Sequence, residues 1–391
     1  MKKISDSVFY LGISDKERKM FDQLVPLREG TTYNSYLVKG AEKNALIDTM
    51  YAPFAAEFLA EIKAADAKID YIVSNHAEQD HSSLIPALLE LFPEAQVLCS
   101  AKCAENLKNM LGAKPEKIRV VADKEEVSLG GKTLRFYMAA FAHWPDTMFT
   151  YLTEENMLFT CDFFGAHYTS FDLYADNSPA LELAAKSYYA EIMMPFASFC
   201  RKHLAVAEQI NPAMVLPSHG AVYKDPKFIF DLYRKWTSTE VSGKVLIAYV
   251  SMYGNTETMA RNLEKQLQGL GVCAKAIDLM EANEAEIAEE LIDATGFIFG
   301  TSCILAGPHP RLVYLAYLIS ILKPQLKFYS LIGSIGWGGN LLAPIEANLK
   351  IPAIQKIESF IVKGAPTGGD LAAMGKFAKT IAAKVAEVSG K

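Results

Sequence analysis

The stretch Ser74-Asn75-His76-Ala77-Glu78-Gln79-Asp80-His81 carries four metal-binding side chains within six residues. It begins at the end of a β-strand predicted over residues 71–74, and it precedes a predicted helix over residues 82–92. A loop between a strand and a helix can direct imidazole and carboxylate groups to one point. The stretch therefore predicts a metal site at the carboxyl end of a strand, where α/β proteins build their sites.

Three further candidate ligands follow other predicted strands. His143 comes after the strand predicted over residues 134–140, Asp162 follows the strand 157–161, and His219 follows the apolar run 214–216. Each of these, taken alone, is more readily explained as a hydrogen-bonded polar residue of a loop. Together, four of the seven histidines join three acidic residues in the same kind of position, which favours one shared metal site.

Length and composition limit the possible functions. A chain of 391 residues is too long for one ordinary core and predicts at least two domains. A hydrophobic content of 51% and a net charge of -6 indicate a compact protein without nucleic acid as a partner. The longest apolar run, residues 312–322, predicts a buried helix rather than a membrane span, which needs roughly 20 residues. Six scattered cysteines without a CxxC pair favour a reducing cytoplasm.

The strand and helix pattern changes near residues 236–243, and we predict domains over residues 1–242 and 243–391. The first half reads as short strands, including a hairpin of strands 148–152 and 157–161 joined by a turn at 154–156. In the second half strands alternate with amphipathic helices, which is typical of a parallel sheet covered on both faces. Its predicted strands cover residues 244–250, 272–277, 296–300, 328–333 and 357–362.

The ligand pattern resembles that of the metallo-β-lactamase superfamily and, within it, that of the flavodiiron proteins. The flavodiiron pattern is His-x-Glu-x-Asp, a histidine about 62 residues later, an aspartate after 18 more, and a distant histidine. Here 62 residues separate Asp80 from His143, and 18 separate His143 from Asp162. Glu78 stands where the zinc hydrolases of the superfamily carry a histidine. The resemblance implies an N-terminal αββα sandwich followed by a flavodoxin-like, doubly wound parallel sheet.

The resemblance also implies two non-haem iron ions. Carboxylate-rich ligation independently favours iron or manganese, because dinuclear zinc hydrolases use more imidazole. His81 either binds the second iron or stands beside it, and Asp146 either orients a ligand imidazole or caps a turn. By resemblance, one iron is held by His76, Glu78 and His143, the other by Asp80 and His219, and Asp162 bridges them.

The second half begins with a candidate phosphate-binding loop, Ser251-Met252-Tyr253-Gly254-Asn255-Thr256, between a strand and a helix that runs to about residue 268. Hydroxyl groups and backbone N–H donors at a helix N-terminus bind phosphate. The loop has no lysine after its glycine and no Gly-x-Gly-x-x-Gly pattern, which excludes a Walker loop and disfavours a dinucleotide site. An ordinary capped turn between strand and helix is the alternative.

Two later loops strengthen the prediction of a cofactor site. They are Thr301-Ser302-Cys303, and Ser334-Ile335-Gly336-Trp337-Gly338-Gly339. Three loops at one edge of a sheet suit a flat stacked ring with a phosphate tail. This half resembles flavodoxin, which implies FMN, with Trp337 near the isoalloxazine and Met252-Tyr253 beside it. Many relatives have Ser-Pro-Thr where this chain has Ser302-Cys303, so Cys303 either places a thiol near the flavin or is a buried cysteine without a role.

The resemblance to flavodiiron proteins covers essentially the whole chain. It implies an oxidoreductase that reduces O2 to water, NO to N2O, or both, at a diiron site that receives electrons from FMN. It also implies an external electron donor, such as rubredoxin or a reduced deazaflavin, and a head-to-tail homodimer or a dimer of such dimers. Two alternatives are a zinc hydrolase with a fused flavodoxin-like domain and a non-enzymatic electron carrier or redox sensor.

Overall fold

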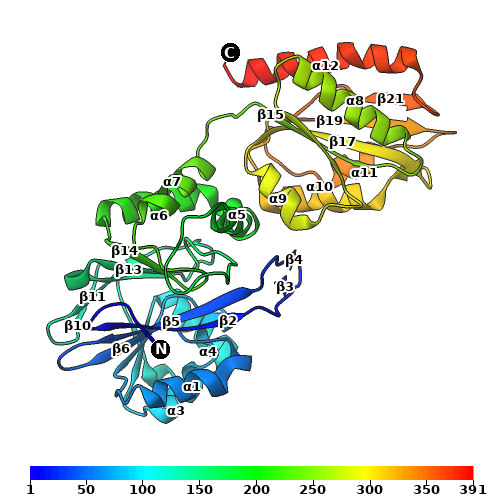
Figure 1. The fold of residues 1–391 in the computed structure, drawn as a ribbon. Helices are drawn as coiled ribbons and strands as arrows, with labels where there is room; N and C mark the ends of the chain where they lie inside the picture. The colour runs from blue at the N-terminus through cyan, green and yellow to red at the C-terminus, as the bar shows by residue number, and fades with distance from the viewer. Residues whose placement is uncertain (391) are drawn as a thin grey trace. The chain divides into compact units, whose positions relative to one another are not determined.

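The computed structural model describes residues 1–390, which form two compact units that divide after Thr237 (Figure 1). The predicted boundary after residue 242 lies a few residues further on, within the irregular segment 238–243. That segment joins α7 (Lys227–Trp236) of the first unit to β15 (Lys244–Val250) of the second.

The first unit is built on two sheets and a small hairpin formed by β3 (Met20–Phe21) and β4 (Val25–Pro26). In spatial order, the seven-stranded sheet consists of β1 (Lys2–Lys3), β2 (Val8–Asp15), β5 (Thr31–Lys39), β6 (Asn44–Ile47), β7 (Tyr71–Ser74), β8 (Gln96–Cys99) and β9 (Ile118–Val120). The five-stranded sheet consists of β10 (Glu126–Ser128), β11 (Thr133–Met138), β12 (Met148–Leu152), β13 (Met157–Cys161) and β14 (Met214–Pro217).

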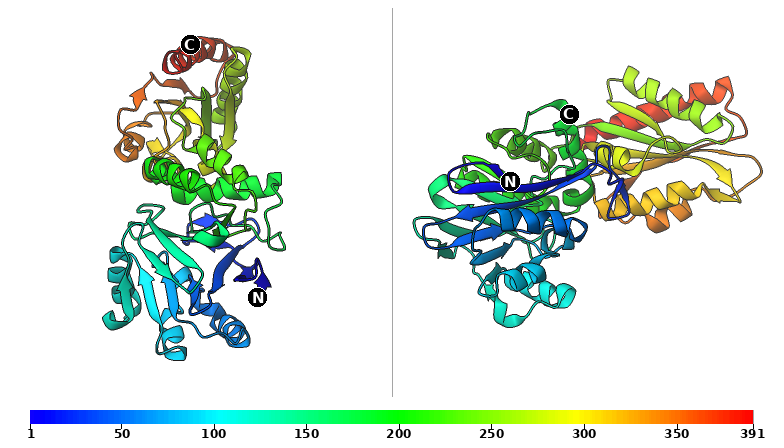
Figure 2. Two further views of the ribbon diagram at one scale, coloured as in Figure 1. Left: turned by 90° about the vertical axis from the view of Figure 1, so that its left-hand side faces the viewer. Right: turned by 60° about the horizontal axis from the view of Figure 1, so that its bottom comes forward.

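An apolar core fills the space between these two sheets. Ile47 and Val73 enter it from the first sheet, and Phe136, Phe159 and Leu216 enter it from the second. Helices cover the outer face of each sheet (Figure 2), so that the predicted αββα sandwich is confirmed. They are α1 (Ala55–Ala64), α3 (Ile85–Leu91) and α4 (Ala101–Leu111) on the first sheet, and α5 (Pro179–Tyr188), α6 (Ala197–Ile210) and α7 on the second.

Short helical turns lie between the main elements of the first unit. One of them corrects the sequence prediction of a helix over residues 82–92. The turn α2 (Gln79–Ser82) begins earlier, and the main helix, α3, begins only at Ile85, with Pro86 in its first turn. Asp80 and His81 therefore lie in a helical turn rather than in a loop. The other short turns are η1 (Ala52–Phe54), η2 (Pro115–Lys117), η3 (Thr153–Glu155), η4 (Tyr189–Met193) and η5 (Met194–Phe196).

The second unit is a parallel sheet with strand order β16-β15-β17-β19, followed by β20 and β21, the 2-1-3-4-5 order of flavodoxin-like folds. Its further strands are β16 (Ala274–Asp278), β17 (Ala294–Ile304), β18 (Gly307–Pro308), β19 (Phe328–Ile335), β20 (Gln355–Lys356) and β21 (Phe360–Lys363). In Figure 1, α8 (Asn255–Gly269) and α12 (Gly368–Val388) cover one face, and α9 (Glu284–Leu291), α10 (Pro310–Leu322) and α11 (Ala343–Asn348) lie on the other.

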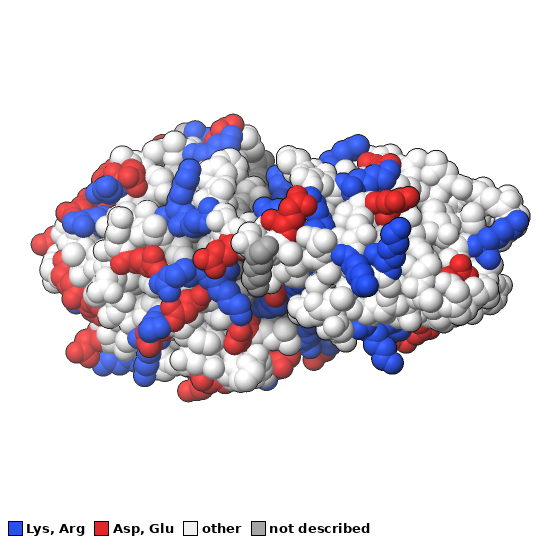
Figure 3. Space-filling model, turned by 90° about the horizontal axis from the view of Figure 1, so that it is seen from above, with Lys and Arg blue, Asp and Glu red and all other residues white. Residues whose placement is uncertain are grey.

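Two predictions for this unit were wrong in detail. The strand expected over residues 357–362 starts too early, because β20 ends at Lys356, before this range, and β21 begins only at Phe360. The apolar run 312–322 does form a helix, α10, but one side of it is exposed, including Tyr317 at 54%. Among the described residues, no helix combines the length and apolar character needed to cross a membrane. On the face drawn in Figure 3, side chains of both charges are interspersed.

Candidate metal centre and flavin site

The predicted ligands of the first unit follow strands that end at one edge of its sandwich. Because β11 and β13 both run antiparallel to β12, and β14 runs parallel to β13, their carboxyl ends share that edge. His143 lies in the loop after β11, Asp162 directly follows β13, and His219 follows β14. The loop after β7 brings His76 and Glu78 from the other sheet, and α2 carries Asp80 and His81.

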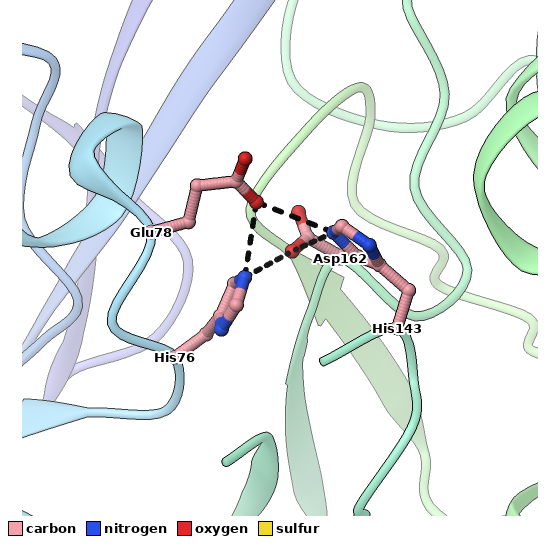
Figure 4. Close-up of side chains that lie close together, drawn as sticks. All are labelled: His76, Glu78, His143 and Asp162. Atoms are coloured by element: carbon pink, nitrogen blue, oxygen red, sulfur yellow. Dashed lines mark hydrogen bonds and ion pairs between the residues drawn. The ribbon is translucent and has the colours of Figure 1, made fainter. Parts of the chain in front are cut away.

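The first group of converging side chains comprises His76, Glu78, His143 and Asp162, whose ligand atoms all lie within 4.8 Å of one another (Figure 4). Glu78 Oε2 is 3.0 Å from His76 Nε2 and 3.3 Å from His143 Nε2. Asp162 Oδ2 is 3.6 Å from each of the same two nitrogens. Two imidazoles and two carboxylates thus face one point.

The second group comprises Asp80, His81 and His219. Asp80 Oδ1 is 3.3 Å from His81 Nε2, and Asp80 Oδ2 is 3.2 Å from His219 Nε2. Asp162 Oδ1 lies 3.0 Å from His81 Nε2 and 3.4 Å from His219 Nε2. Asp162 therefore turns one oxygen toward each group, which is the geometry of a carboxylate shared by two cations.

Several ligand atoms of the two groups lack hydrogen-bond partners, which a bound metal ion would replace. Asp80 Oδ1 and Oδ2, Asp162 Oδ2 and His219 Nε2 are buried and have no hydrogen-bond partner, although they lie close to other ligand atoms. Buried polar atoms without a partner are costly, and a coordinated cation satisfies them. The mixture of imidazole nitrogens and carboxylate oxygens suits non-haem iron.

The electrostatics of the site favour positive charge. Burial disfavours an imidazolium, yet the nearby carboxylates of Asp162 and Glu78 raise the pKa of His143 to about 9. Burial likewise lowers the pKa of His219, but the nearby carboxylates of Asp162 and Asp80 outweigh it and raise that pKa to about 10. Although burial opposes ionisation, the imidazoles of His81, His143 and His219 hold the pKa of Asp162 well below its usual value. Carboxylates that stay ionised when buried attract cations, and two divalent ions meet that demand.

Hydrogen bonds from outside the cluster fix the orientation of several of these side chains. His76 Nδ1 lies 3.2 Å from Asp146 Oδ1, while the backbone N–H of Ala77 donates to Asp146 Oδ2 at 2.8 Å. Asp146 therefore orients an imidazole, one of its two predicted roles. His219 Nδ1 lies 2.5 Å from the Thr32 carbonyl oxygen, which fixes Nε2 as the nitrogen that faces the cluster.

Two buried residues that the sequence did not single out also support the site. Tyr188, at the end of α5, donates a hydrogen bond to Asp162 Oδ1 at 2.9 Å. Asp48 accepts hydrogen bonds from the backbone N–H and the side-chain amide of Asn75, at 2.8 and 3.0 Å, and so holds the start of the His76 loop. Neither residue belongs to a local motif, since both reach the site through the packing of distant elements.

The first flavin loop has the geometry of a phosphate-binding turn. Gly254, with φ of 83°, precedes α8, whose first residue is Asn255. The hydroxyl groups of Ser251 and Thr256 are buried without a hydrogen-bond partner. Ser302, at the adjacent end of β17, has a third such hydroxyl. Unpartnered hydroxyls beside a helix N-terminus fit the phosphate end of FMN.

Among the other predicted flavin residues, some side chains are exposed and others already donate hydrogen bonds to backbone carbonyls. Met252 is 45% exposed, and Tyr253 and Trp337 are 86% and 82% exposed. The Thr301 hydroxyl donates to the Ser302 carbonyl, and that of Ser334 donates to the Gly364 carbonyl, so both already have partners. Ile335 ends β19, and Gly336, Gly338 and Gly339 lie in the loop that follows it.

Comparison with known proteins decides the family. Residues 31–220 match the family model described as ODP family beta lactamase, and residues 247–326 match Flavodoxin. The chain is 35% identical to a nitric oxide reductase of Moorella thermoacetica, with 98% of each chain covered. It is 31% identical to a coenzyme F420H(2) oxidase of Methanocaldococcus jannaschii, over 99% of this chain and 97% of the relative.

A flavo-diiron protein of Clostridium acetobutylicum is 30% identical over 98% of this chain and 99% of its own length. The chain belongs to the flavodiiron protein family. The rubredoxin oxygen:oxidoreductase of Desulfovibrio gigas has the same fold, with a TM-score of 0.91, 30% identity and 98% of each chain covered. As a flavodiiron protein with a flavodoxin domain, the chain is an oxidoreductase whose cofactors are FMN and a non-haem diiron centre.

Proposed function

We propose that this flavodiiron protein reduces O2 to water, NO to N2O, or both. The observation that carries the proposal is Asp162, whose two carboxylate oxygens each face one group of candidate ligands in a chain that also carries a flavodoxin domain. The relatives named above as a nitric oxide reductase and a rubredoxin oxygen:oxidoreductase support the choice of substrates.

The proposed ligands follow the two groups. His76, Glu78 and His143 hold one iron, Asp80 and His219 hold the other, and Asp162 bridges them. We assign His81 to the second iron, because its Nε2 faces Asp80 and Asp162 together with that of His219. Its other nitrogen, Nδ1, is buried and has no hydrogen-bond partner.

In the proposed reaction the protein binds the cofactors and orients their ligands, and the cofactors carry the electrons. When bound, reduced FMN would supply two electrons and the two ferrous ions one each; these four electrons and four protons convert O2 to two water molecules, while two electrons and two protons convert two NO molecules to N2O and one water. Asp146 and the Thr32 carbonyl keep the imidazoles of His76 and His219 aligned. Tyr188 donates to the bridging carboxylate, so that its oxygens stay directed at both groups.

Ser251, Thr256 and Ser302 bind the FMN phosphate end in this proposal, and Tyr253 and Trp337 lie beside the isoalloxazine. The exposed apolar side chains at this edge, Tyr253, Leu305 and Trp337, support burial of the flavin face in a head-to-tail homodimer. A variant that stays monomeric, keeps both cofactors and retains full turnover contradicts the dimer.

The electron donor is proposed to be a small external carrier, with rubredoxin and a reduced deazaflavin as candidates. The names of the Desulfovibrio gigas and Methanocaldococcus jannaschii relatives support these two. We further propose that the enzyme acts in the cytoplasm, in keeping with six cysteines that are all free thiols. We propose a domain boundary after residue 242, within the irregular segment 238–243.

The decisive experiment is an anaerobic assay of the iron-loaded, FMN-loaded protein with O2 and with NO separately, using one chemical electron donor. We expect consumption of at least one gas, with water or N2O as product and no released peroxide. A protein that retains zinc, excludes iron and hydrolyses a thioester or lactam would instead be a hydrolase. A protein whose flavin cycles without consuming either gas would be an electron carrier.

A further inference from the structure

Two loops of the predicted flavin site are joined by a thiol. The hairpin of β17 and β18 carries Cys303, and the loop after β19 carries Gly338. Cys303 Sγ donates a hydrogen bond to the Gly338 carbonyl oxygen at 3.1 Å. Cys303 is only half-buried, whereas the alternative prediction was a buried cysteine.

The same two loops meet closely at two further points. The backbone N–H of Asn340 donates to the Ala306 carbonyl oxygen at 3.0 Å. Gly339 has φ of 136°, and a Cβ placed on it would come within 2.7 Å of both the Ala306 oxygen and Cys303 Sγ. Only glycine therefore allows the loops to approach to this distance.

The contacts of Cys303 and Ala306 with residues 338–340 are called the joint below. The joint lies between two parts of the predicted flavin site. On the hairpin side, Ser302 is next to Cys303, is only 8% exposed, and has a buried hydroxyl without a partner. On the other side, Trp337 directly precedes Gly338 and is 82% exposed. An unpartnered hydroxyl in such a position points to a bound ligand, because proteins satisfy nearly all buried polar atoms.

We propose that Cys303 is a positioning residue of the flavin site, whose thiol holds the Trp337 loop against the hairpin that carries Ser302. The inference rests on the proposed function for the role of FMN. When the thiol donor is lost, the hydrogen bond from the Asn340 N–H to the Ala306 carbonyl oxygen remains, but the two loops are held together less firmly. The phosphate-side and ring-side contacts with FMN are then no longer held at a fixed spacing.

The test uses three variants of the full-length, iron-loaded protein, with the FMN dissociation constant and the FMN midpoint potentials as readouts. Cys303→Ala removes the donor, Cys303→Ser restores a donor of similar size, and Cys273→Ala changes an exposed cysteine of the same unit. We expect Cys303→Ala to weaken FMN binding about three- to tenfold, the value of one net hydrogen bond, and to shift the potentials. Cys303→Ser should stay within about twofold of the wild type, and Cys273→Ala should match it.

A second pair of variants tests the joint without changing the thiol. Gly339→Ala forces the loops apart, whereas Gly307→Ala, in the same hairpin, meets no atom closer than 3.8 Å. Gly339→Ala should reproduce the weaker FMN binding and shifted potentials of Cys303→Ala, and Gly307→Ala should leave both unchanged. Wild-type FMN affinity and potentials in Cys303→Ala and Gly339→Ala, in a protein that reduces O2 or NO, would overturn the inference. A wild-type protein that binds no FMN would instead overturn the proposed function first.

Discussion

The metal centre and the flavin edge solve the problem of binding a cofactor in opposite ways. Around the metal centre, His76, Asp162 and His219 are almost fully buried, and hydrogen bonds from behind fix their direction. At the flavin edge, Tyr253 and Trp337 are largely exposed. The ligands of a small cation must be aligned before it binds, whereas a large planar ring can itself order the side chains that cover it.

The comparison predicts that substitution of a metal ligand strongly lowers iron content and turnover but leaves the flavin site unchanged. Asp162→Ala removes the carboxylate that faces both groups, so we expect the iron content to fall below two per chain. The four-electron and two-electron reactions both need the pair of ions, and turnover with O2 or NO should fall by about 100-fold or more. Iron analysis and steady-state rates measure these effects.

FMN content should remain that of the wild type in Asp162→Ala, because Asp162 belongs to the other compact unit. The matched control is Asp172→Ala, which removes an exposed carboxylate paired with Lys2 and should change neither iron nor rate. Full turnover by an Asp162→Ala protein with two irons would contradict the assignment of the bridge.

The orienting role of Asp146 gives the next largest effect. Asp146→Asn keeps the size of the side chain but weakens its hold on His76 Nδ1. Loss of such a partner of a ligand imidazole lowers metal affinity by about 10- to 100-fold. Competition with an iron chelator measures the change. An unchanged affinity would show that Asp146 only accepts the Ala77 N–H and caps the turn.

At the flavin edge, deletion of a hydroxyl should weaken cofactor binding without destabilising the cofactor-free protein. Thr256→Ala removes a buried hydroxyl that has no partner within the protein. The free energy of unfolding of the FMN-free variant should therefore equal or exceed that of the FMN-free wild type. FMN binding should weaken about tenfold, because a hydrogen bond to a charged group contributes about 1.5 kcal/mol or more.

Denaturant unfolding of the FMN-free protein and fluorescence titration with FMN separate these two effects of Thr256→Ala. The control is Thr380→Ala, at an exposed hydroxyl on α12 that donates to the Lys376 carbonyl. Lower stability of the FMN-free variant together with normal FMN affinity would mean that the hydroxyl is structural and not a ligand contact.

The smallest expected effect belongs to Tyr188. Tyr188→Phe removes the hydrogen bond to Asp162 Oδ1 but keeps a ring packed 4.8 Å from that of His167. One net hydrogen bond of about 1 kcal/mol predicts a several-fold loss of affinity for iron or of rate, with both irons still able to bind. Loss of all iron in this variant would show that the bridge depends on Tyr188 far more than one hydrogen bond explains.

The sequence predicted most of the metal centre because its chemistry is concentrated. His, Asp and Glu at the ends of strands are rare enough that their type and spacing indicate a shared site, and the structure brings all seven predicted side chains together. The Thr32 carbonyl left no signal, since every residue has one. Tyr188 was equally hidden, as one of 18 tyrosines that approaches Asp162 only through the packing of α5.

The fold was predicted best where local pattern and tertiary packing agree. The strands β7, β12, β13 and β15 have the predicted bounds. β5 was missed because its buried residues include Thr31, Thr32, Asn34 and Ser35, whose burial depends on distant hydrogen-bond partners such as the Pro217 and Gly220 carbonyls. The joint between the flavin loops was equally invisible, because Cys303 and Gly338 meet only after β17 and β19 pair.

The central claim is a pair of iron ions on either side of Asp162. Anomalous diffraction from crystals of the iron-loaded protein, recorded at the iron absorption edge, tests it most directly. The account predicts two peaks about 3.5–4 Å apart, one next to His76, Glu78 and His143 and the other next to Asp80, His81 and His219. A single peak, or two peaks of which neither contacts Asp162, would contradict it.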